Sequence, residues 1–215
     1  MFLSQQQLTG VLLIAAFVSF AIGASLPVVG ANGNPRFYAL PIDDHLRAVA
    51  GNSAAWRLAN VLMGTAAVIL LAGLSLLTTS LESAQEPVLS RLGLLGWLLA
   101  TTLWVAFSAF RAIVTTRAAY AFSTQDSADL LPAGYELMSR WAFGFFYGYA
   151  VIGYLALMAY GGSLAQLSIL PAWVGWTTGV LSLAFLIHLL VTGDTLPAFH
   201  YLPPLLIGLL LVIQT

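Results

Sequence analysis

Long apolar runs separated by short polar segments dominate the chain. Six runs approach or exceed the roughly 20 residues that an α-helix needs to cross a hydrocarbon core about 30 Å thick. They cover residues 7–29, 55–79, 92–115, 141–163, 172–192 and 197–214. None of them alternates apolar and polar residues in steps of two, so helices are favoured over the strands of a β-barrel. The pattern predicts an all-α, polytopic membrane helix bundle that forms one domain over residues 1–215.

The sixth run is the shortest of the set. It contains Pro203 and Pro204, and we expect it to lie tilted at the rim of the bundle or to thin the bilayer locally. Elsewhere small residues recur four apart, at Gly144 and Gly148 and again at Gly175 and Gly179. Such spacing lets helices approach closely, and we interpret it as packing within the chain rather than as a dimer seam.

Two polar loops carry the pattern of short interfacial helices. In the first loop, "PIDDHLRAVAGN" (41–52) places Asp43 as a helix cap and turns Leu46 and Val49 toward the protein. The third loop, "QDSADLLPAGYELMSRW" (125–141), is similarly amphipathic and ends on Trp141, an interfacial anchor. We expect the two helices to cover one polar face of the bundle.

Composition supports a membrane location and removes several kinds of chemistry. Hydrophobic residues make up 60% of the chain and charged residues 7%, against about 25% charged in a typical soluble domain. The chain has no cysteine and no lysine, which excludes disulfides, thiolate metal sites, a retinal Schiff base and a P-loop lysine. A formal net charge of −1 gives no reason to expect nucleic acid as a partner.

Charge is concentrated on one side of the expected bundle. With six crossings, the first, third and fifth loops share a side, and both termini lie on the other. Six of the seven basic residues fall on the loop side, together with six acids and all three histidines. The basic residues are Arg36, Arg47, Arg57, Arg111, Arg117 and Arg140. The positive-inside rule therefore predicts that this side faces the cytoplasm of a bacterial inner membrane, with both termini outside.

A polar stripe on the third predicted helix marks a candidate binding surface. Its members follow spacings of three and four: Thr101, Trp104, Ser108, Arg111 and Thr115. An arginine within hydrocarbon costs several kcal/mol unless it pairs, snorkels or faces water. Arg111 is near the polar side, so snorkelling is the simple interpretation, and a bound anion, carboxylate or headgroup is the alternative. Arg57 and Asn60 on the second helix extend this polar lining.

The first loop is expected to lie over the ends of the helices that carry Arg111 and His188. In that position, Asp43 or Asp44 would form an ion pair with an arginine of another segment. The alternative is a surface turn whose charged side chains are solvated and form no such ion pair.

The three histidines allow a metal or haem hypothesis. His188 and His200 flank a short turn, and His45 with Asp44 could join them to give three nitrogens and one oxygen. No HxxH, HxxxH or HExxH pair enforces such geometry. Separate, hydrogen-bonded interfacial histidines are therefore favoured, and no cofactor is predicted beyond the possible metal ion or haem at the histidines.

A family resemblance adds a fold without an activity. The segment "SILPAWVGWTTGV" (168–180) follows a Tyr- and Gly-rich fourth helix. Across residues 141–192, this order resembles bacterial six-helix integral membrane proteins of unknown function. The resemblance implies a six-helix fold and no functional residue.

Three functions are compatible with these patterns. The favoured one is a non-catalytic protein, either an accessory subunit of a membrane assembly or a binder of lipid-like molecules through the polar side. Its expected partners are membrane lipids and other membrane subunits. The alternatives are a metal-dependent membrane enzyme using His45, His188 and His200, and a small transporter whose path is lined by Arg57, Asn60 and Arg111.

Overall fold

The computed structural model describes residues 3–124, 134–167 and 169–214, and every regular element in these ranges is helical. Five helical spans are long and apolar enough to cross a membrane. They are α1 (Gln5–Gly30), α3 (Ser53–Ser83), the continuous span Val88–Thr124, α6 (Tyr135–Gln166) and α7 (Ala172–Thr192). Large apolar side chains such as Val61, Leu95 and Leu190 are exposed on their sides. The predicted all-α bundle of apolar helices is confirmed.

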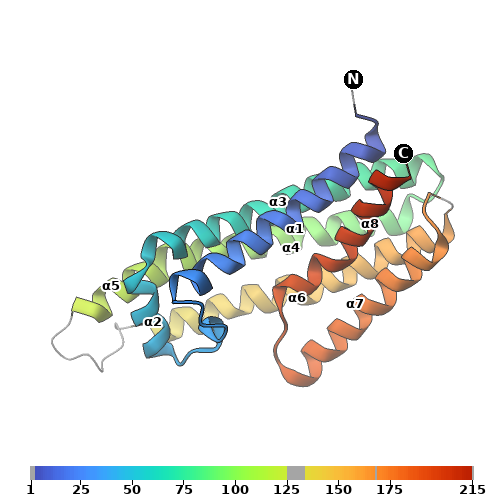
Figure 1. Ribbon diagram of the computed structural model, residues 1–215. Coiled ribbons are helices and arrows are strands. Elements are labelled where there is room, and N and C mark those ends of the chain that lie inside the picture. Colours follow the sequence, from blue (N-terminus) through green and yellow to red (C-terminus); the bar gives the residue numbers. More distant parts are fainter. Residues whose placement is uncertain (1–2, 125–133, 168, 215) are drawn as a thin grey trace.

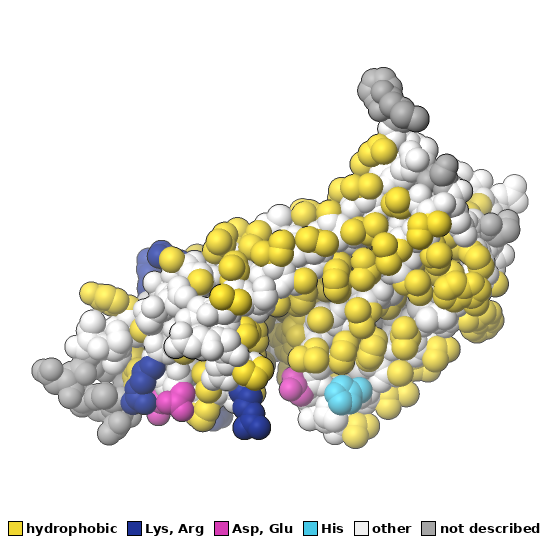
Figure 2. All heavy atoms as spheres, in the orientation of Figure 1, with side chains coloured by type: hydrophobic (Ala, Val, Ile, Leu, Met, Phe, Trp, Pro, Cys, Tyr) yellow, Lys and Arg dark blue, Asp and Glu magenta, His cyan; other side chains and the backbone are white. Residues whose placement is uncertain are grey.

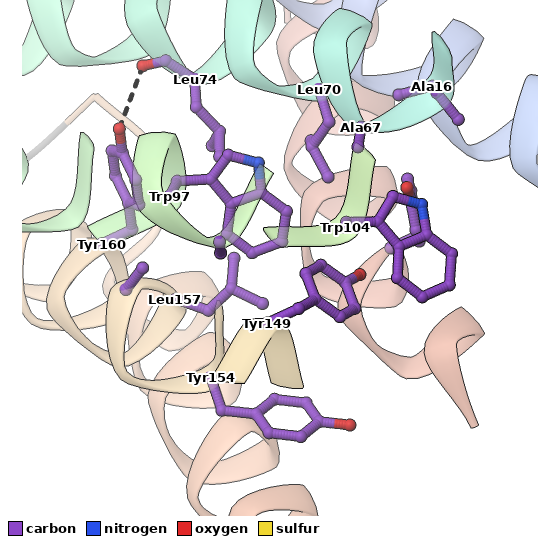
Figure 3. Close-up of a cluster of buried hydrophobic side chains, with 14 of the residues drawn as sticks. Ala16, Ala67, Leu70, Leu74, Trp97, Trp104, Tyr149, Tyr154, Leu157 and Tyr160 are labelled. Carbon is purple, nitrogen blue, oxygen red and sulfur yellow. Dashed lines mark hydrogen bonds between the residues drawn. The ribbon is translucent and has the colours of Figure 1, made fainter. Parts of the chain in front are cut away.

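The helices run lengthwise beside one another (Figure 1), and their contacts form a closed cycle. Helix α1 packs on α3, which packs on α4 (Val88–Phe110), and α4 packs on α6. Helix α7 then packs on α6, and the short α8 (Leu202–Ile213) contacts both α7 and α1. Aromatic side chains fill the centre: Trp97 and Trp104 of α4 face Tyr149 of α6, below Leu70 of α3 (Figure 3). These contacts bury the inward faces, while the outward faces remain apolar.

Residues 197–214 do not form the expected sixth transmembrane helix. Residues 197–214 form a 3-10 turn, η3 (Pro197–His200), followed by the 12-residue α8. Together they form one apolar helical segment, Pro197–Ile213, which is shorter than the roughly 20 residues that cross a hydrocarbon core about 30 Å thick. The cause is local, because Pro197, Pro203 and Pro204 cannot donate backbone hydrogen bonds and confine the α-helix to the end of the run. The chain still turns back after α7, so that both termini lie at the same end of the molecule (Figure 1).

The third span is longer than predicted and is interrupted. It runs from α4 through a π-helical turn, η2 (Arg111–Thr115), into α5 (Thr116–Thr124). The carbonyl oxygen of Arg111 accepts a hydrogen bond of 2.8 Å from Nε1 of Trp56 on α3. This partner outside the helix helps to hold the wider turn. Single π-turns of this kind occur often at functional sites.

The first loop contains the predicted short helix. Helix α2 (Ile42–Gly51) buries Leu46 and Val49, as expected from the pattern. It begins two residues earlier than predicted, after Pro41, so that Asp43 lies in the first turn instead of capping the helix. Carboxylates in a first turn are favourable because they oppose the positive end of the helix dipole.

The expected helix in the third loop is only partly covered by the structure. Residues 125–133 lie outside the described ranges. From Tyr135 onward the segment belongs to α6, so these residues are the first turns of a long helix rather than a separate cover. Trp141 is exposed there, as expected of an interfacial anchor.

The small residues at Gly175 and Gly179 pack within the chain. Gly175 on α7 meets the backbone of Gly161 and Ala165 on α6, and the backbone of Gly179 also approaches Gly161. Gly144, in contrast, has open space where a side chain would be. The close approach of α6 and α7 therefore explains one of the two glycine pairs.

Candidate functional site

Charged side chains gather at one end of the molecule, which we call the polar end. It consists of the loop 31–41, α2, η2, α5, the first turns of α6 and the turn between α7 and α8. Figure 2 shows basic, acidic and histidine side chains along this end, whereas hydrophobic side chains cover the long sides. The predicted concentration of charge on the side of the odd-numbered loops is visible on this face.

Arg111 lies in an aromatic box at the polar end. Its Cζ atom is 4.4 Å from the ring centroid of Trp56 and 5.4 Å from those of Tyr38 and Phe107. Among the residues that the structure describes, no carboxylate oxygen lies within 4.0 Å of the guanidinium. Cation–π contacts of this kind contribute about 0.5–2 kcal/mol each, more when they are desolvated. The partners of Arg111 within the described chain are therefore aromatic residues, and one of them, Tyr38, also forms a side-chain hydrogen bond with it.

Tyr38 brings the loop 31–41 onto this box. Its hydroxyl donates a hydrogen bond of 2.9 Å to the carbonyl oxygen of Ala24 on α1. Burial raises the pKa of Tyr38, and the positive charge of Arg111 partly opposes that rise. The loop thus joins α1 to the Arg111 turn and closes one side of the box.

The acids of α2 do not reach the box. Asp44 pairs with Arg47 of the same helix at 3.4 Å, and both side chains are more than half exposed. The predicted ion pair between Asp43 or Asp44 and an arginine of another segment does not form. Helix α2 is instead held on α5 by its buried Leu46 and Val49 and by Arg47, whose Cζ is 5.4 Å from the ring of Phe122. Burial of apolar side chains and a cation–π contact thus hold α2 in place of the expected ion pair.

The three histidines occupy three different environments. His45 lies beside Phe37 and Trp56, His188 is exposed on α7, and His200 is fully buried in the core. Within the described part of the chain, no group of three His, Asp or Glu side chains could hold a metal ion. The structure therefore does not bring His45, His188 and His200 together, and its geometry gives the metal or haem hypothesis no support.

Two of these histidines have defined packing roles. Nδ1 of His45 donates to the carbonyl oxygen of Phe37 at 3.3 Å. Burial and the nearby Arg111 charge lower the pKa of His45 to about 4, against the opposing effect of that hydrogen bond. His200 stacks on Tyr154 with ring centroids 3.8 Å apart, and its Nε2 donates to the carbonyl oxygen of Ala150 at 3.1 Å.

Asn60 and Ser108 both line a groove between α3 and α4, on the outer surface of the bundle. Its volume is about 350 Å³. The residues lining this α3–α4 groove are Asn60, Val61, Gly64, Thr65, Val68, Val105, Ser108, Ala109 and Ala112. Arg57 is exposed and Arg111 is boxed by aromatic rings, so Arg57, Asn60 and Arg111 do not line one path. The predicted polar lining is thus divided between the groove and the aromatic box.

Sequence reasoning missed Glu86, at the end opposite to the polar end. Its carboxylate accepts hydrogen bonds from the backbone N–H of Leu89 and Ser90 at 2.8 and 3.1 Å, and from Oγ of Ser163 at 2.5 Å. Burial raises the pKa of Glu86, but these hydrogen bonds outweigh it and hold the pKa below its ordinary value. The signal was an acid directly before Pro87 and an apolar helix, where a carboxylate can satisfy free N–H groups.

Comparisons with protein-family models, with curated proteins and with solved structures gave no match to this chain. The resemblance to bacterial six-helix membrane proteins therefore stays a prediction, and so does the cytoplasmic location of the polar end.

Proposed function

We propose that this chain is an integral membrane protein that binds lipid-like molecules with an anionic headgroup at its polar end. The observation that carries the proposal is Arg111, a cation enclosed by three aromatic rings without a carboxylate partner among the described residues. A partly buried charge without a counter-ion is unfavourable in a low-dielectric setting, and a bound anion relieves that cost.

The aromatic box leaves Arg111 able to bind an anion. Aromatic rings interact with the faces of the guanidinium, whereas its five N–H donors point outward in its plane. One of these donors meets the hydroxyl of Tyr38, and no carboxylate of the described residues pairs with the others. Phosphate and carboxylate oxygens match this planar fork in a bidentate manner, so stacking and anion binding are compatible on one side chain.

The surroundings favour a lipid-like source for the anion. Arg111 lies toward the end of an apolar span of 37 residues, where the helix leaves the hydrocarbon and headgroups begin. Exposed apolar side chains of the same span, including Val105 and Ile113, would contact acyl chains. A lipid whose headgroup binds Arg111 and whose acyl chains lie along these residues supplies both an anion for the guanidinium and an apolar partner for the exposed side chains.

The test uses the purified protein in detergent, titrated with phosphatidylglycerol or with phosphatidylcholine and examined by native mass spectrometry. We expect the wild type to retain phosphatidylglycerol in preference to phosphatidylcholine. In Arg111→Gln, affinity for phosphatidylglycerol should fall by about tenfold, which corresponds to 1.4 kcal/mol. The matched control is Arg57→Gln. Arg57 is an exposed arginine at the same end, and its substitution removes the same charge.

Equal retention of phosphatidylglycerol by wild type and Arg111→Gln would contradict the proposal. So would an equal loss in Arg57→Gln, because the effect would then come from net charge alone. Competition by inorganic phosphate at millimolar concentration would assign the site to a soluble anion instead of a lipid headgroup.

A further inference from the structure

We infer that the α3–α4 groove is a separate site within the bilayer, which binds the hydroxyl group of a single-chain apolar alcohol. This inference goes beyond the proposed function, because it depends on Asn60 and Ser108 and not on Arg111. Either site can fail its test while the other stands.

The walls of the groove suit an alkyl chain. Val61, Val68 and Val105 line it and are exposed at its mouth, on a surface of helices that are apolar enough to cross a membrane. The volume of about 350 Å³ lies at the small end of ligand pockets, which span about 300–1,000 Å³. It accommodates part of one chain more readily than a lipid with two chains.

Two of the residues that line the groove are polar, buried and unsatisfied. Asn60 is 1% exposed and Ser108 is 4% exposed. Nδ2 of Asn60 donates to the carbonyl oxygen of Trp56 at 2.8 Å, which leaves Oδ1 as the free end of the amide. Neither this oxygen nor Oγ of Ser108 has a hydrogen-bond partner within the described chain. A buried polar group without a partner is unfavourable.

Ser108, like Thr101, differs from several other hydroxyl residues of its span. Ser90, Thr102 and Thr116 each donate to the carbonyl oxygen four residues earlier, at 2.7–2.9 Å. That local bond is the usual way in which a helix satisfies such a side chain. Ser108 lacks it, and its buried hydroxyl has no other partner within the described chain.

The two free atoms define the chemistry of the ligand. Oδ1 of Asn60 can only accept, so it needs a donor. The Ser108 hydroxyl can donate as well as accept. A single alcohol hydroxyl donates to the first and accepts from the second, whereas an ether has no donor. An anionic headgroup is disfavoured because its charge would face the lone pairs of Oδ1 within hydrocarbon.

Gly64 keeps this site open. A Cβ atom there would meet only Cβ and Oγ of Ser108, at 3.6 and 3.9 Å, which are ordinary contact distances. A larger side chain at this position can therefore be accommodated without displacing the backbone, and it would occupy the groove. Gly144 on α6 is a matched control, because a side chain there also enters open space but lies outside the groove.

The experiment measures binding of radiolabelled 1-dodecanol to the full chain in phosphatidylcholine nanodiscs, with empty nanodiscs as background. We expect saturable binding in the wild type and in Gly144→Leu. We expect at least tenfold weaker binding in Ser108→Ala, Asn60→Leu and Gly64→Leu. Dodecyl methyl ether, which has the chain but no donor, should compete at least tenfold less well than unlabelled dodecanol.

Three outcomes would overturn the inference: no saturable binding above empty nanodiscs, equal competition by the ether, or unchanged affinity in both Ser108→Ala and Asn60→Leu. Efficient disulfide dimers of a Val105→Cys variant would also overturn it, because they would assign the groove to a second copy of the chain. The absence of native cysteine makes that cross-link unambiguous. Ser108→Ala removes one oxygen only, which keeps the test independent of a folding defect in Asn60→Leu. In Arg111→Gln, dodecanol binding should be unchanged.

Discussion

Replacing Gly175 by alanine tests the seam between α6 and α7. An added Cβ at Gly175 would lie 2.6 Å from the carbonyl oxygen of Gly161 and 2.7 Å from Cα of Ala165, and closer still to the backbone nitrogen of Ala165. These are backbone atoms, which cannot rotate away as a side chain does. Since non-bonded carbon contacts are relaxed at about 3.5–4.0 Å, the two helices must separate by roughly 1 Å.

Two opposing effects set the size of the change. Alanine is favoured over glycine in a helix interior by about 0.5–1 kcal/mol, whereas forcing extra atoms into a packed interface costs about 1–3 kcal/mol, occasionally more. The second effect should dominate at Gly175, because three backbone atoms resist it. At Gly179, one turn later on the same helix, an added Cβ meets nothing within 4 Å, so only the first effect applies.

We therefore expect Gly175→Ala to lower the free energy of unfolding by about 1–3 kcal/mol and Gly179→Ala to leave it unchanged or raise it slightly. The assay is unfolding of each variant in mixed micelles with increasing mole fraction of dodecyl sulfate, followed by far-ultraviolet circular dichroism. Equal stability of the two variants would refute the close approach of α6 and α7, because helix propensity affects both in the same way.

Two further predictions concern groups outside the spans. The pKa of His45 is lowered to about 4 in the folded chain from an ordinary 6.5, so between these values the unfolded chain binds a proton that the folded chain does not. Stability should therefore fall as the pH is lowered from 7 to 4, by at most about 3 kcal/mol at 1.4 kcal/mol per pKa unit. His45→Phe should flatten that part of the unfolding profile, and an unchanged slope would contradict it. Glu86→Gln should cost about 1–3 kcal/mol at pH 7, and the wild-type advantage should disappear as the pH falls below 4.5 through the lowered pKa of Glu86. Glu82→Gln, which removes an exposed ion pair with Arg91, should cost less than about 1 kcal/mol.

The chain's own pattern was enough to predict most of the helices. The boundaries of α7 were predicted without error, and α1 and α3 extend only a few residues beyond the predicted runs. Helix α2 and its buried Leu46 and Val49 were also predicted. These features are local, because the length of an apolar run and the spacing of its apolar residues decide whether a helix can span hydrocarbon or lie on its surface.

Predictions that depended on partners succeeded less often. The sequence marked Arg111, Asn60 and Ser108 as polar residues in an apolar setting, but it assigned them to one lining. In the folded chain, Arg111 lies in an aromatic box, whereas Asn60 and Ser108 line a groove. Asp44 pairs with Arg47, which lies one turn away in the same helix, and not with an arginine of another segment.

The physical reason is the range of the interactions. Burial of an apolar face is non-directional, and its pattern along the chain is preserved in any packing of the helices. Hydrogen bonds, ion pairs and ring contacts depend on distances of a few ångströms and on the direction of each side chain. The π-turn at Arg111–Thr115 and the close approach at Gly175 set those directions. Composition and periodicity thus determined which segments are helices long and apolar enough to cross a membrane, and only the packing of the helices decided which polar groups meet.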